Sequence, residues 1–380
     1  MKIAKLHLEN FRNHTKTTIE CADHANVFLG NNGAGKTNIV EGLAYLCVTK
    51  SFYAANDVTA LKIGEPGFRI SGEMISDGGN GFSVTICYDA SASEKKYLLN
   101  GKPVQKLASL IGKFPVVILS PEYSGITFGT PSDRRKFLDL VISQASASYL
   151  ENLLEYRRIL RQRNKLLSDA KLFGEERTDL LDPWNEGLIE YGARVLQRRL
   201  EFVQEFAPYL GRAYSAIAGE DEIPESQYVS SIPAGSVRDI ESARERFRQL
   251  LSLSRQEERR AGLTLVGPHR DDLMFALSGM ELRRYGSQGQ HRTFLIAMKI
   301  AEFEFLRTLS GETPILILDD VFSELDVHRA SRLLETVSPL GQYFITTTDE
   351  RIFPGTFFAE SGNKKDVVKG GSIIREQAAA

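Results

Sequence analysis

The sequence is poor in the residues that build metal centres and disulfide frameworks. Its 380 residues include three cysteines, Cys21, Cys47 and Cys87, which lie far apart and form no Cys-x-x-Cys pair. The six histidines show no metal-ligand spacing. A zinc site or a set of disulfides requires paired or clustered cysteines and histidines. The sequence therefore argues against both and predicts a reducing compartment.

A long apolar run is also missing. The first residues, from Met1 to His7, are interrupted by Lys2 and Lys5 and lack the apolar core of a signal peptide. No later stretch is long and apolar enough to span a membrane. We therefore expect a cytoplasmic protein that has no membrane partner.

A large net charge of either sign is absent as well. The 47 Lys and Arg residues and the 49 Asp and Glu residues give a formal net charge of −2. Proteins that bind nucleic acid carry a basic surface, so any such surface here must be local. The hydrophobic content of 42% is enough for the cores of one large or two ordinary domains.

What the sequence does contain is a phosphate-binding loop. Residues 26–29 form a short apolar run typical of a buried strand, and residues 38–46 have helical apolar spacing. Between them, glycines let the backbone direct its N–H groups at a phosphate, and the lysine and threonine of the motif reach phosphates and Mg²⁺. The alternative is a glycine-rich turn before a helix that happens to carry Lys-Thr. The loop consists of Gly30, Asn31, Asn32, Gly33, Ala34, Gly35, Lys36 and Thr37.

A second element is an apolar strand that ends in two carboxylates. Residues 315–318 are continuously apolar, and Asp319 and Asp320 follow where a buried parallel strand emerges at its carboxyl end. In P-loop proteins an acidic residue at this place holds Mg²⁺ beside the loop hydroxyl. We assign that role to Asp319 and expect Asp320 to orient or deprotonate the attacking water. Taken alone, two carboxylates that cap the next turn would explain the pattern equally well.

A third element is a Ser-x-Gly-Gln segment before a helical run. Ser287, Gly289 and Gln290 precede apolar positions with helical spacing over residues 293–300. A serine and a glycine at a helix N-terminus form an anion site. Because the chain already has one phosphate loop, a second anion site suggests that the nucleotide is shared between two subunits. The alternative is an ordinary helix cap.

The patterning divides the chain into three parts. Residues 1–130 contain the P-loop and β-rich segments, residues 131–261 have long helical patterns, and residues 262–380 return to α/β patterning. We expect the middle part to be an all-α arm that interrupts an α/β domain. Within it, residues 219–236 are expected to form a loop, and Ser132 is expected to cap the first helix.

The order of these parts resembles the ATP-binding-cassette head of the structural-maintenance class of ATPases. That class carries a long coiled coil in the place where this chain has a short helical insertion. The resemblance implies an α/β, P-loop ABC-type ATPase head with a β-rich first lobe, interrupted by an all-α helical arm that is a short coiled-coil stub.

Four segments narrow the resemblance to the RecF family of bacterial DNA replication and repair proteins. They are residues 8–13, 129–139, 267–273 and 318–326, and the resemblance runs from residue 1 to about residue 350. It implies ATP as the nucleotide, with the P-loop as Walker A and the two aspartates as Walker B. It further implies that residues 287–290 are the signature motif that faces the partner subunit's γ-phosphate, and that residues 323–326 are the D-loop at a dimer seam.

The resemblance also implies roles for single residues. Arg12 matches the arginine that helps to hold nucleotide in related heads. Thr347 or Thr348 falls where cassette ATPases place a switch histidine, and Asp320 stands where many have glutamate. Both departures imply slow hydrolysis. The glutamine that contacts Mg²⁺ in the first lobe is not located, and its candidates are Gln105, Gln144 and the turn at residues 120–122.

Contact with DNA is less visible. Arginines spaced three or four apart on a helix share a face and can meet phosphates. No base-reading motif accompanies them, so binding would be independent of sequence and sensitive to salt. The alternative is a solvated, charged face of the arm. The residues concerned are Arg157, Arg158, Arg161, Arg163 and Lys165 on the first long helix, and Arg194, Arg198 and Arg199 on the second.

Together with the resemblance, these features predict an ATP-controlled DNA clamp. Two subunits would sandwich two ATP molecules as a homodimer, close on double-stranded and single-stranded DNA at gaps, and reopen by slow, DNA-stimulated hydrolysis. The family implies cooperation with RecO and RecR and loading of a recombinase on single-stranded DNA. Two alternatives stay open, namely a transport-type cassette ATPase subunit and a scaffold that binds ATP without hydrolysing it.

Overall fold

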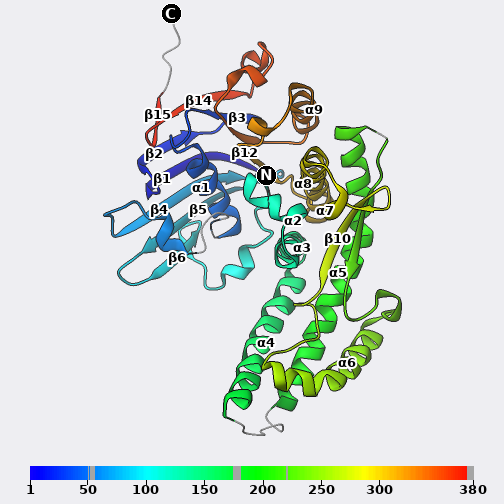
Figure 1. The fold of residues 1–380 in the computed structure, drawn as a ribbon. Helices are drawn as coiled ribbons and strands as arrows, with labels where there is room; N and C mark the ends of the chain where they lie inside the picture. Colours follow the sequence, from blue (N-terminus) through cyan, green and yellow to red (C-terminus); the bar gives the residue numbers. More distant parts are fainter. Residues whose placement is uncertain (50, 52–55, 174–180, 220, 375–380) are drawn as a thin grey trace, which may run out of the picture. The chain divides into compact units, whose positions relative to one another are not determined.

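The computed structural model describes residues 1–49, 51, 56–173, 181–219 and 221–374 (Figure 1). The chain forms two compact units. The first comprises Met1–Ser124, Arg212–Glu220 and Leu295–Ala380, and the second comprises Gly125–Gly211 and Asp221–Phe294. The second unit therefore includes residues 262–294, which the sequence analysis places with the head.

A mostly parallel sheet organises the first unit, with the strand order β15-β14-β3-β13-β12-β8. Strands β12 and β13 are buried along their whole length, as parallel strands covered on both faces are. The carboxyl ends of the parallel strands meet at one edge, where α/β sheets bind their ligands. The strand bounds are β3 (Ala25–Leu29), β8 (Val116–Leu119), β12 (Ile315–Asp319), β13 (Tyr343–Thr347), β14 (Lys364–Lys369) and β15 (Ser372–Ile374).

A second, antiparallel sheet of the same unit has the order β2-β1-β4-β5-β6-β7. The turn between β6 and β7 has Asn100 and Gly101 at φ of 50° and 74°, the hairpin geometry that this residue pair predicts. The bounds are β1 (Lys2–Phe11), β2 (His14–Glu20), β4 (Gly67–Ile75), β5 (Gly81–Asp89), β6 (Glu94–Leu99) and β7 (Lys102–Pro103).

Helix α1 (Lys36–Val48) contacts both sheets of the first unit. It packs against β1 and β4 of one sheet and against β12, β13 and β8 of the other. Nearly all of its residues are buried, and a helix enclosed in this way has no need of a polar face. Its buried charges, Lys36 and Glu41, are therefore unusual, because a buried charge is costly unless it is paired.

The remaining helices of the first unit are short, apart from α8. Helix α8 begins in the second unit and ends in the first. The bounds are α8 (Gln288–Ser310), α9 (Val327–Val337), η1 (Asp57–Ala60), η2 (Leu107–Leu110), η3 (Pro121–Ser124), η6 (Phe322–Glu324), η7 (Glu350–Ile352) and η8 (Phe357–Ala359).

Long helices dominate the second unit. Helix α4 packs against α3 and α6, and α3 also contacts strand β10. The last residues of α5 belong to the first unit. The bounds are α2 (Gly125–Phe128), α3 (Pro131–Ala145), α4 (Ala147–Phe173), α5 (Asp182–Ala218), η5 (Ala234–Ser236), α6 (Ile240–Ala261) and α7 (Leu282–Tyr285).

The loop expected over residues 219–236 is wrong in part. Residues Pro224–Val229 form strand β9, which pairs antiparallel with β10 (Asp272–Leu277), and β11 (Met280–Glu281) completes this sheet. The partner strand lies far along the chain. Strand formation depends on such a partner, so the local sequence does not reveal it.

The expected cap of the first arm helix is also wrong. Thr130 and Asp133 form a reciprocal capping box at the start of α3. Pro131 takes the first helical position, where its missing N–H group costs nothing. Ser132 therefore lies inside the helix.

The two charged segments most specific to the RecF resemblance, residues 129–139 and 267–273, meet inside the second unit. Arg134 makes a bidentate ion pair with Asp272, with N–O distances of 2.7 and 2.8 Å. Arg199 is 2% exposed and bridges both segments, since it donates to a carboxylate of the first and to a backbone carbonyl of the second. These segments contribute to the packing of the unit.

Candidate nucleotide-binding site

The P-loop joins β3 to α1. Gly33 and Gly35 have φ of 78° and 109°, in the left-handed region that strains any residue with a Cβ. A Cβ at Gly30 would lie 2.3 Å from the Val368 carbonyl oxygen. The backbone geometry therefore requires all three glycines. Helix α1 begins at Lys36, within the loop motif, so the N–H groups of its first turn have no partner in the helix and can bind an anion.

Lys36 is bonded to the loop itself. Its side chain is 7% exposed, and its ammonium group donates to the carbonyl oxygens of Gly30 (2.7 Å) and Asn31 (3.1 Å). Burial lowers the pKa of the amine, and the carboxylates of Asp320 and Asp319 oppose this shift. Phosphate oxygens accept stronger, charge-assisted bonds than carbonyls do. The amine is therefore placed to exchange the loop carbonyls for a phosphate.

The structure brings Thr37 and Asp319 together. The Thr37 hydroxyl donates to Asp319 Oδ1 at 2.9 Å, and the hydroxyl of Thr346 on β13 donates to the same oxygen at 2.6 Å. The carboxylate of Asp319 is completely buried. Hydroxyl and carboxylate oxygens are the hard donors that Mg²⁺ prefers. These two residues therefore fit the metal that the motif implies.

Asp320 follows in an unusual backbone conformation. Its φ is 52°, which aspartate tolerates better than most residues do. Its N–H group donates to the Thr346 hydroxyl at 2.9 Å, and its carbonyl accepts from Ser323. Both backbone groups are therefore fixed, and the side chain is half-buried. Strained backbone of this kind clusters at functional sites.

The two threonines at the place of the switch histidine differ in environment. The hydroxyl of Thr347 is buried and exchanges hydrogen bonds with the backbone of Asp349. Thr348 is exposed and lies one residue beyond the end of β13. Thr348 is therefore the residue whose side chain stays available at this sheet edge.

Ser120 stands out among the candidates for the Mg²⁺ contact of the first lobe. It follows Leu119, whose parallel partner Leu318 directly precedes Asp319, so Ser120 and Asp319 lie side by side at the strand ends. Its hydroxyl is buried and has no hydrogen-bond partner among the described residues. Gln105 is exposed in the loop after β7, and Gln144 is buried in the second unit.

Arg12 is held by the buried carboxylate of α1. Its guanidinium donates to both oxygens of Glu41, at 2.8 and 2.7 Å, and to the Thr59 carbonyl at 2.7 Å. The pKa of Arg12 is raised, first by the hydrogen bond to Glu41. This pair accounts for one of the two charges that α1 buries.

The Ser-x-Gly-Gln segment lies in the second unit, at the start of α8. Ser287 Oγ accepts from the Gln290 N–H at 3.2 Å, and Gln290 Oε1 accepts from the Ser287 N–H at 2.7 Å. The Gln290 amide also donates to Glu222 at 2.5 Å. The two interpretations of this segment, a helix cap and an anion site, do not exclude each other. A capped helix N-terminus can also bind an anion.

Most of the arginines expected to contact DNA are already bonded to acidic groups. Where both partners are exposed, as in Arg158–Glu155, such pairs are weak and a phosphate can replace the carboxylate, whereas the partner of Arg157, Asp139, is buried. The pairs are Arg157–Asp139 (2.7 Å), Arg158–Glu155 (2.8 Å), Arg194–Glu190 and Arg198–Glu205 (2.9 Å).

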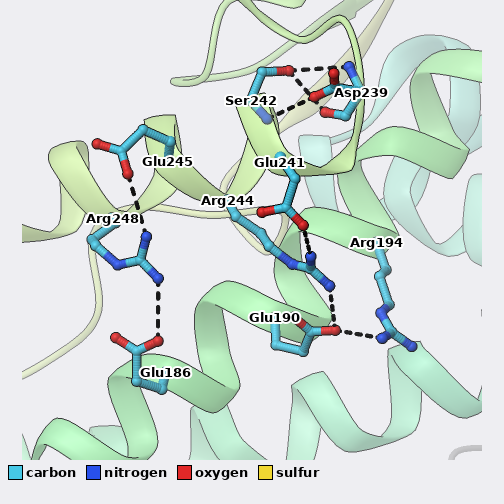
Figure 2. Close-up of polar contacts among 9 residues, drawn as sticks. All are labelled: Glu186, Glu190, Arg194, Asp239, Glu241, Ser242, Arg244, Glu245 and Arg248. Carbon is cyan, nitrogen blue, oxygen red and sulfur yellow. Dashed lines mark hydrogen bonds and ion pairs between the residues drawn. The ribbon is translucent and has the colours of Figure 1, made fainter.

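Figure 2 shows ion pairs that link α5 to α6, together with the pair of Arg194 within α5. Glu190 accepts from both Arg194 and Arg244, and Arg248 bridges Glu186 and Glu245. The positive charge on this side of the arm is therefore matched by carboxylates.

Two of the expected arginines differ sharply from each other. Arg163 is 2% exposed, and its guanidinium is engaged by Glu258 (2.5 Å), Asn185 and Thr264. Arg163 therefore holds α4 to its neighbours. The prediction that Arg163 and Arg199 contact DNA is wrong, because both side chains are buried. Arg161 is exposed, and the structure gives its side chain one hydrogen bond, to a carbonyl of its own helix.

Two further features, membrane-spanning helices and metal-binding clusters, are absent from the described residues. Within them, none of the helices is both long and apolar enough to cross a membrane. The same residues contain no cluster of three or more His, Cys, Asp or Glu side chains arranged to hold a metal ion.

The chain is similar to known proteins over most of its length. The profile of the RecF/RecN/SMC N terminal domain matches residues 2–357. The DNA replication and repair protein RecF of Chloroherpeton thalassium is 41% identical over 360 residues, which are 93% of this chain and 96% of that protein. This chain belongs to the RecF family.

Solved structures agree with membership of the RecF family. A structure described as the recombination mediator protein RecF-ATP in the RecFOR pathway has a TM-score of 0.90 and 31% identity, and covers 99% of this chain and 97% of its own. An SMC head, described as bound to the C-winged helix domain of ScpA, has a TM-score of 0.57 at 12% identity and covers 98% of this chain and 96% of its own. The fold is thus the α/β P-loop ATPase head that RecF and SMC proteins share.

Sequence reasoning missed several residues that contact the predicted site. Glu41 and Thr346 bond Arg12 and Asp319, and Asn13 and His14 contact the P-loop backbone. A charge within the apolar pattern of residues 38–46 is a signal for Glu41. The others carry no such signal, because distant strands bring them to the loop.

Proposed function

We propose that this chain is an ATP-dependent DNA-binding protein of replication and recombinational repair. The contact between Thr37 on the P-loop and Asp319 at the end of β12 carries the proposal. It joins the phosphate loop to the acidic strand end, which is the arrangement that Mg²⁺-dependent phosphoryl transfer uses. The names of the RecF relatives, a replication and repair protein and a recombination mediator with ATP, support the same task here.

In this proposal ATP lies on the P-loop, with its phosphates at the N-terminus of α1. Lys36 leaves the carbonyls of Gly30 and Asn31 and binds the phosphates. Thr37 and Asp319 would hold Mg²⁺, which when bound would supply neutralising charge to the phosphates. Asp320 takes a proton from water as the water oxygen bonds to the γ-phosphorus and the β–γ bridging oxygen leaves with ADP.

Ser120 completes the metal site from the first lobe. Its hydroxyl is buried beside Asp319 without a partner among the described residues, and an unsatisfied buried hydroxyl is costly. A Mg²⁺ ion, or a water bound to it, offers that hydroxyl a partner. Ser120 thus takes the role for which related ATPases use glutamine.

Dimerisation follows from the second anion site. Ser287 and Gln290 form a helix N-terminus that a γ-phosphate of a second subunit would complete. The D-loop at residues 323–326 would lie at the seam of the homodimer. ATP bound between two subunits stabilises the closed state over the open state, and slow hydrolysis removes that difference.

In this proposal DNA is bound by arginines of the arm whose side chains are exposed or, for Arg198, partly exposed. Arg161 leads this set, with Arg157, Arg158, Arg194 and Arg198 exchanging carboxylates for phosphates. Such contacts read the backbone and not the bases, so double-stranded and single-stranded DNA both qualify as partners. By the family resemblance, RecO and RecR would act with the closed dimer in loading a recombinase.

The decisive experiment is the molecular mass in solution with and without ATP and Mg²⁺, measured on Asp320→Asn to slow turnover. We expect a monomer that becomes a dimer only with both present. DNA binding is then compared in the two states. A mass that does not respond to ATP would remove the shared-site mechanism, even if ATP is bound.

The rate of ATP hydrolysis tests the alternative that the protein is a scaffold that binds ATP without hydrolysing it. If the wild type hydrolyses ATP no faster than Asp320→Asn does, ATP has a structural role and the hydrolytic reset is wrong. A wild-type rate that is slow but clearly above that of the variant supports the switch.

A further inference from the structure

His14 lies against the outside of the P-loop. It is the first residue of β2, and its side chain is fully buried. One ring nitrogen, Nε2, is 3.1 Å from the Gly35 carbonyl oxygen, and the other, Nδ1, is 2.9 Å from the Thr17 hydroxyl. A carbonyl oxygen only accepts, so Nε2 carries a proton.

The contact between His14 and the P-loop is tight. A Cβ on Gly35 would lie 3.0 Å from His14 Nε2 and 2.6 Å from Asn13 Oδ1. The neighbouring carbonyl of Ala34 accepts from the N–H of Gly371 at 2.9 Å and from Asn13 at 3.3 Å. The turn between β1 and β2 and the turn between β14 and β15 therefore hold the loop through its Ala34 and Gly35 carbonyls.

The Thr17 hydroxyl can be the hydrogen-bond partner of His14 Nδ1 in both protonation states of the ring. It lies 2.9 Å from His14 Nδ1 and 3.1 Å from the Gly371 carbonyl oxygen. With a neutral ring, the hydroxyl donates to Nδ1. With a charged ring, Nδ1–H donates to the hydroxyl oxygen, and the hydroxyl proton turns to Gly371. The change requires a hydroxyl rotation and no movement of heavy atoms.

Burial, with a smaller contribution from one nearby charge, disfavours the charged ring of His14. Burial lowers the pKa of the imidazole, and the Lys62 ammonium, which bonds the Asn13 carbonyl and Thr15, lowers it further. The groups that oppose this shift are the carbonyls of Gly35 and Gly371. From α1, Lys36 contributes a charge that is directed to the carbonyls of Gly30 and Asn31.

We propose that His14 is a positioning residue of the P-loop that takes up a proton when a nucleoside triphosphate binds. The inference deepens the proposed function and rests on its nucleotide site. A bound triphosphate places several negative charges beside Gly35, across the loop backbone from the imidazole. These charges favour imidazolium, as any nearby opposite charge does. Since binding and proton uptake are coupled, each favours the other.

The sign of the pH dependence follows from this linkage. The pKa of His14 is higher in the bound state than in the free state. Affinity for ATP is therefore greatest below the free-state pKa, and the gain is lost as the pH rises through the bound-state pKa. One unit of difference between the two pKa values corresponds to about tenfold in affinity.

The test is calorimetric titration of ATP and Mg²⁺ into wild type and His14→Gln at pH 6 and pH 8, in two buffers that differ in ionisation enthalpy. The comparison removes the protonation of ATP itself, which is common to both proteins. We expect the wild type to take up more protons than His14→Gln, and its affinity to gain about threefold to tenfold more between pH 8 and pH 6. Equal proton uptake by the two proteins would overturn the proposal.

A second variant tests the positioning role. His14→Phe keeps the ring volume and removes both nitrogens, so we expect weaker ATP binding at both pH values with an unchanged unfolded fraction by circular dichroism. If this variant does not fold, the glutamine comparison still decides the protonation. Wild type that binds no ATP at either pH would refute the nucleotide site itself. Wild type that binds ATP with a pH dependence equal to that of His14→Gln would refute the role of His14 alone.

Discussion

Lys36 and Thr37 are both bonded to protein groups that a nucleotide would replace. Lys36 donates to two loop carbonyls, and Thr37 donates to the carboxylate of Asp319. These bonds hold the free site in a defined geometry, so little reorganisation is needed when phosphate and Mg²⁺ arrive. Preorganisation of this kind reduces the entropic cost of binding.

Replacing Lys36 removes the charge that this geometry supplies. We expect Lys36→Ala to lose ATP binding and ATP-dependent dimerisation together, because the phosphates lose their charge-assisted partner. Equilibrium binding and solution mass measure the two effects. Lys96→Ala, at an exposed lysine of β6, is the matched control. Normal affinity in Lys36→Ala would contradict the P-loop assignment.

A substitution of Ser120 tests the proposed Mg²⁺ site. We expect Ser120→Ala to need a severalfold higher Mg²⁺ concentration for half-maximal ATP binding. The melting temperature should be unchanged or slightly raised, because the hydroxyl has no partner among the described residues and removal of an unsatisfied buried group is not destabilising. Ser109→Ala, at an exposed serine of η2, is the control. A lower melting temperature with unchanged Mg²⁺ dependence would show that the hydroxyl is structural.

At the scale of elements, α4 carries arginines of two kinds. Arg163 faces inward and pairs with the buried Glu258, whereas Arg161, two residues earlier, faces solvent. Neighbouring positions on a helix differ by about 100° in direction, so residues two apart lie on nearly opposite sides. The helix therefore separates a packing role, that of Arg163, from the proposed DNA-binding role of Arg161 within one turn.

This separation predicts opposite outcomes for two substitutions. Arg163→Ala leaves Glu258 as a buried carboxylate without its cation, which should cost about 3–5 kcal/mol of unfolding free energy. Arg161→Ala should change stability by less than about 0.5 kcal/mol and reduce both the DNA affinity and its salt dependence. Denaturant unfolding and DNA titrations at several salt concentrations measure these effects. A stability loss at Arg161 would contradict the assignment.

At the scale of the whole molecule, the proposed switch depends on a second copy. The P-loop and the Walker B aspartates belong to the first unit, and the signature segment belongs to the second. Each is complete in its local hydrogen bonds. What ATP adds in the proposal is a ligand that bonds the P-loop of one copy and the signature segment of another.

Ser287→Arg isolates that shared step. The variant protein should bind ATP with wild-type affinity as a monomer but should not dimerise. The arginine side chain would fill the place that the γ-phosphate of the second subunit takes in the proposal. Ser252→Arg, at an exposed serine of α6, is the control for the added charge. Sedimentation with ATP and Mg²⁺ on an Asp320→Asn background gives the mass. A full ATP-dependent dimer from Ser287→Arg would refute the sandwich.

The sequence by itself determined the parts whose information is local. The P-loop glycines, the apolar strands and the Asn100-Gly101 turn are set by the backbone freedom and side-chain pattern of adjacent residues, and the structure contains each of them. The same local reasoning located the acidic end of β12, because a parallel strand buries its apolar run up to that point.

Only the tertiary structure decided which residues surround these parts. The pairing of β9 with β10, the burial of Arg163, the position of Ser120 beside Asp319 and the contact of His14 with Gly35 each join residues that lie far apart in the chain or in different elements. No period or motif encodes such contacts, because they arise from the register between strands and from the closure of loops. Eight consecutive residues were therefore enough to predict the phosphate-binding chemistry of the P-loop. The residues that contact the loop from other elements depend on packing across the whole first unit.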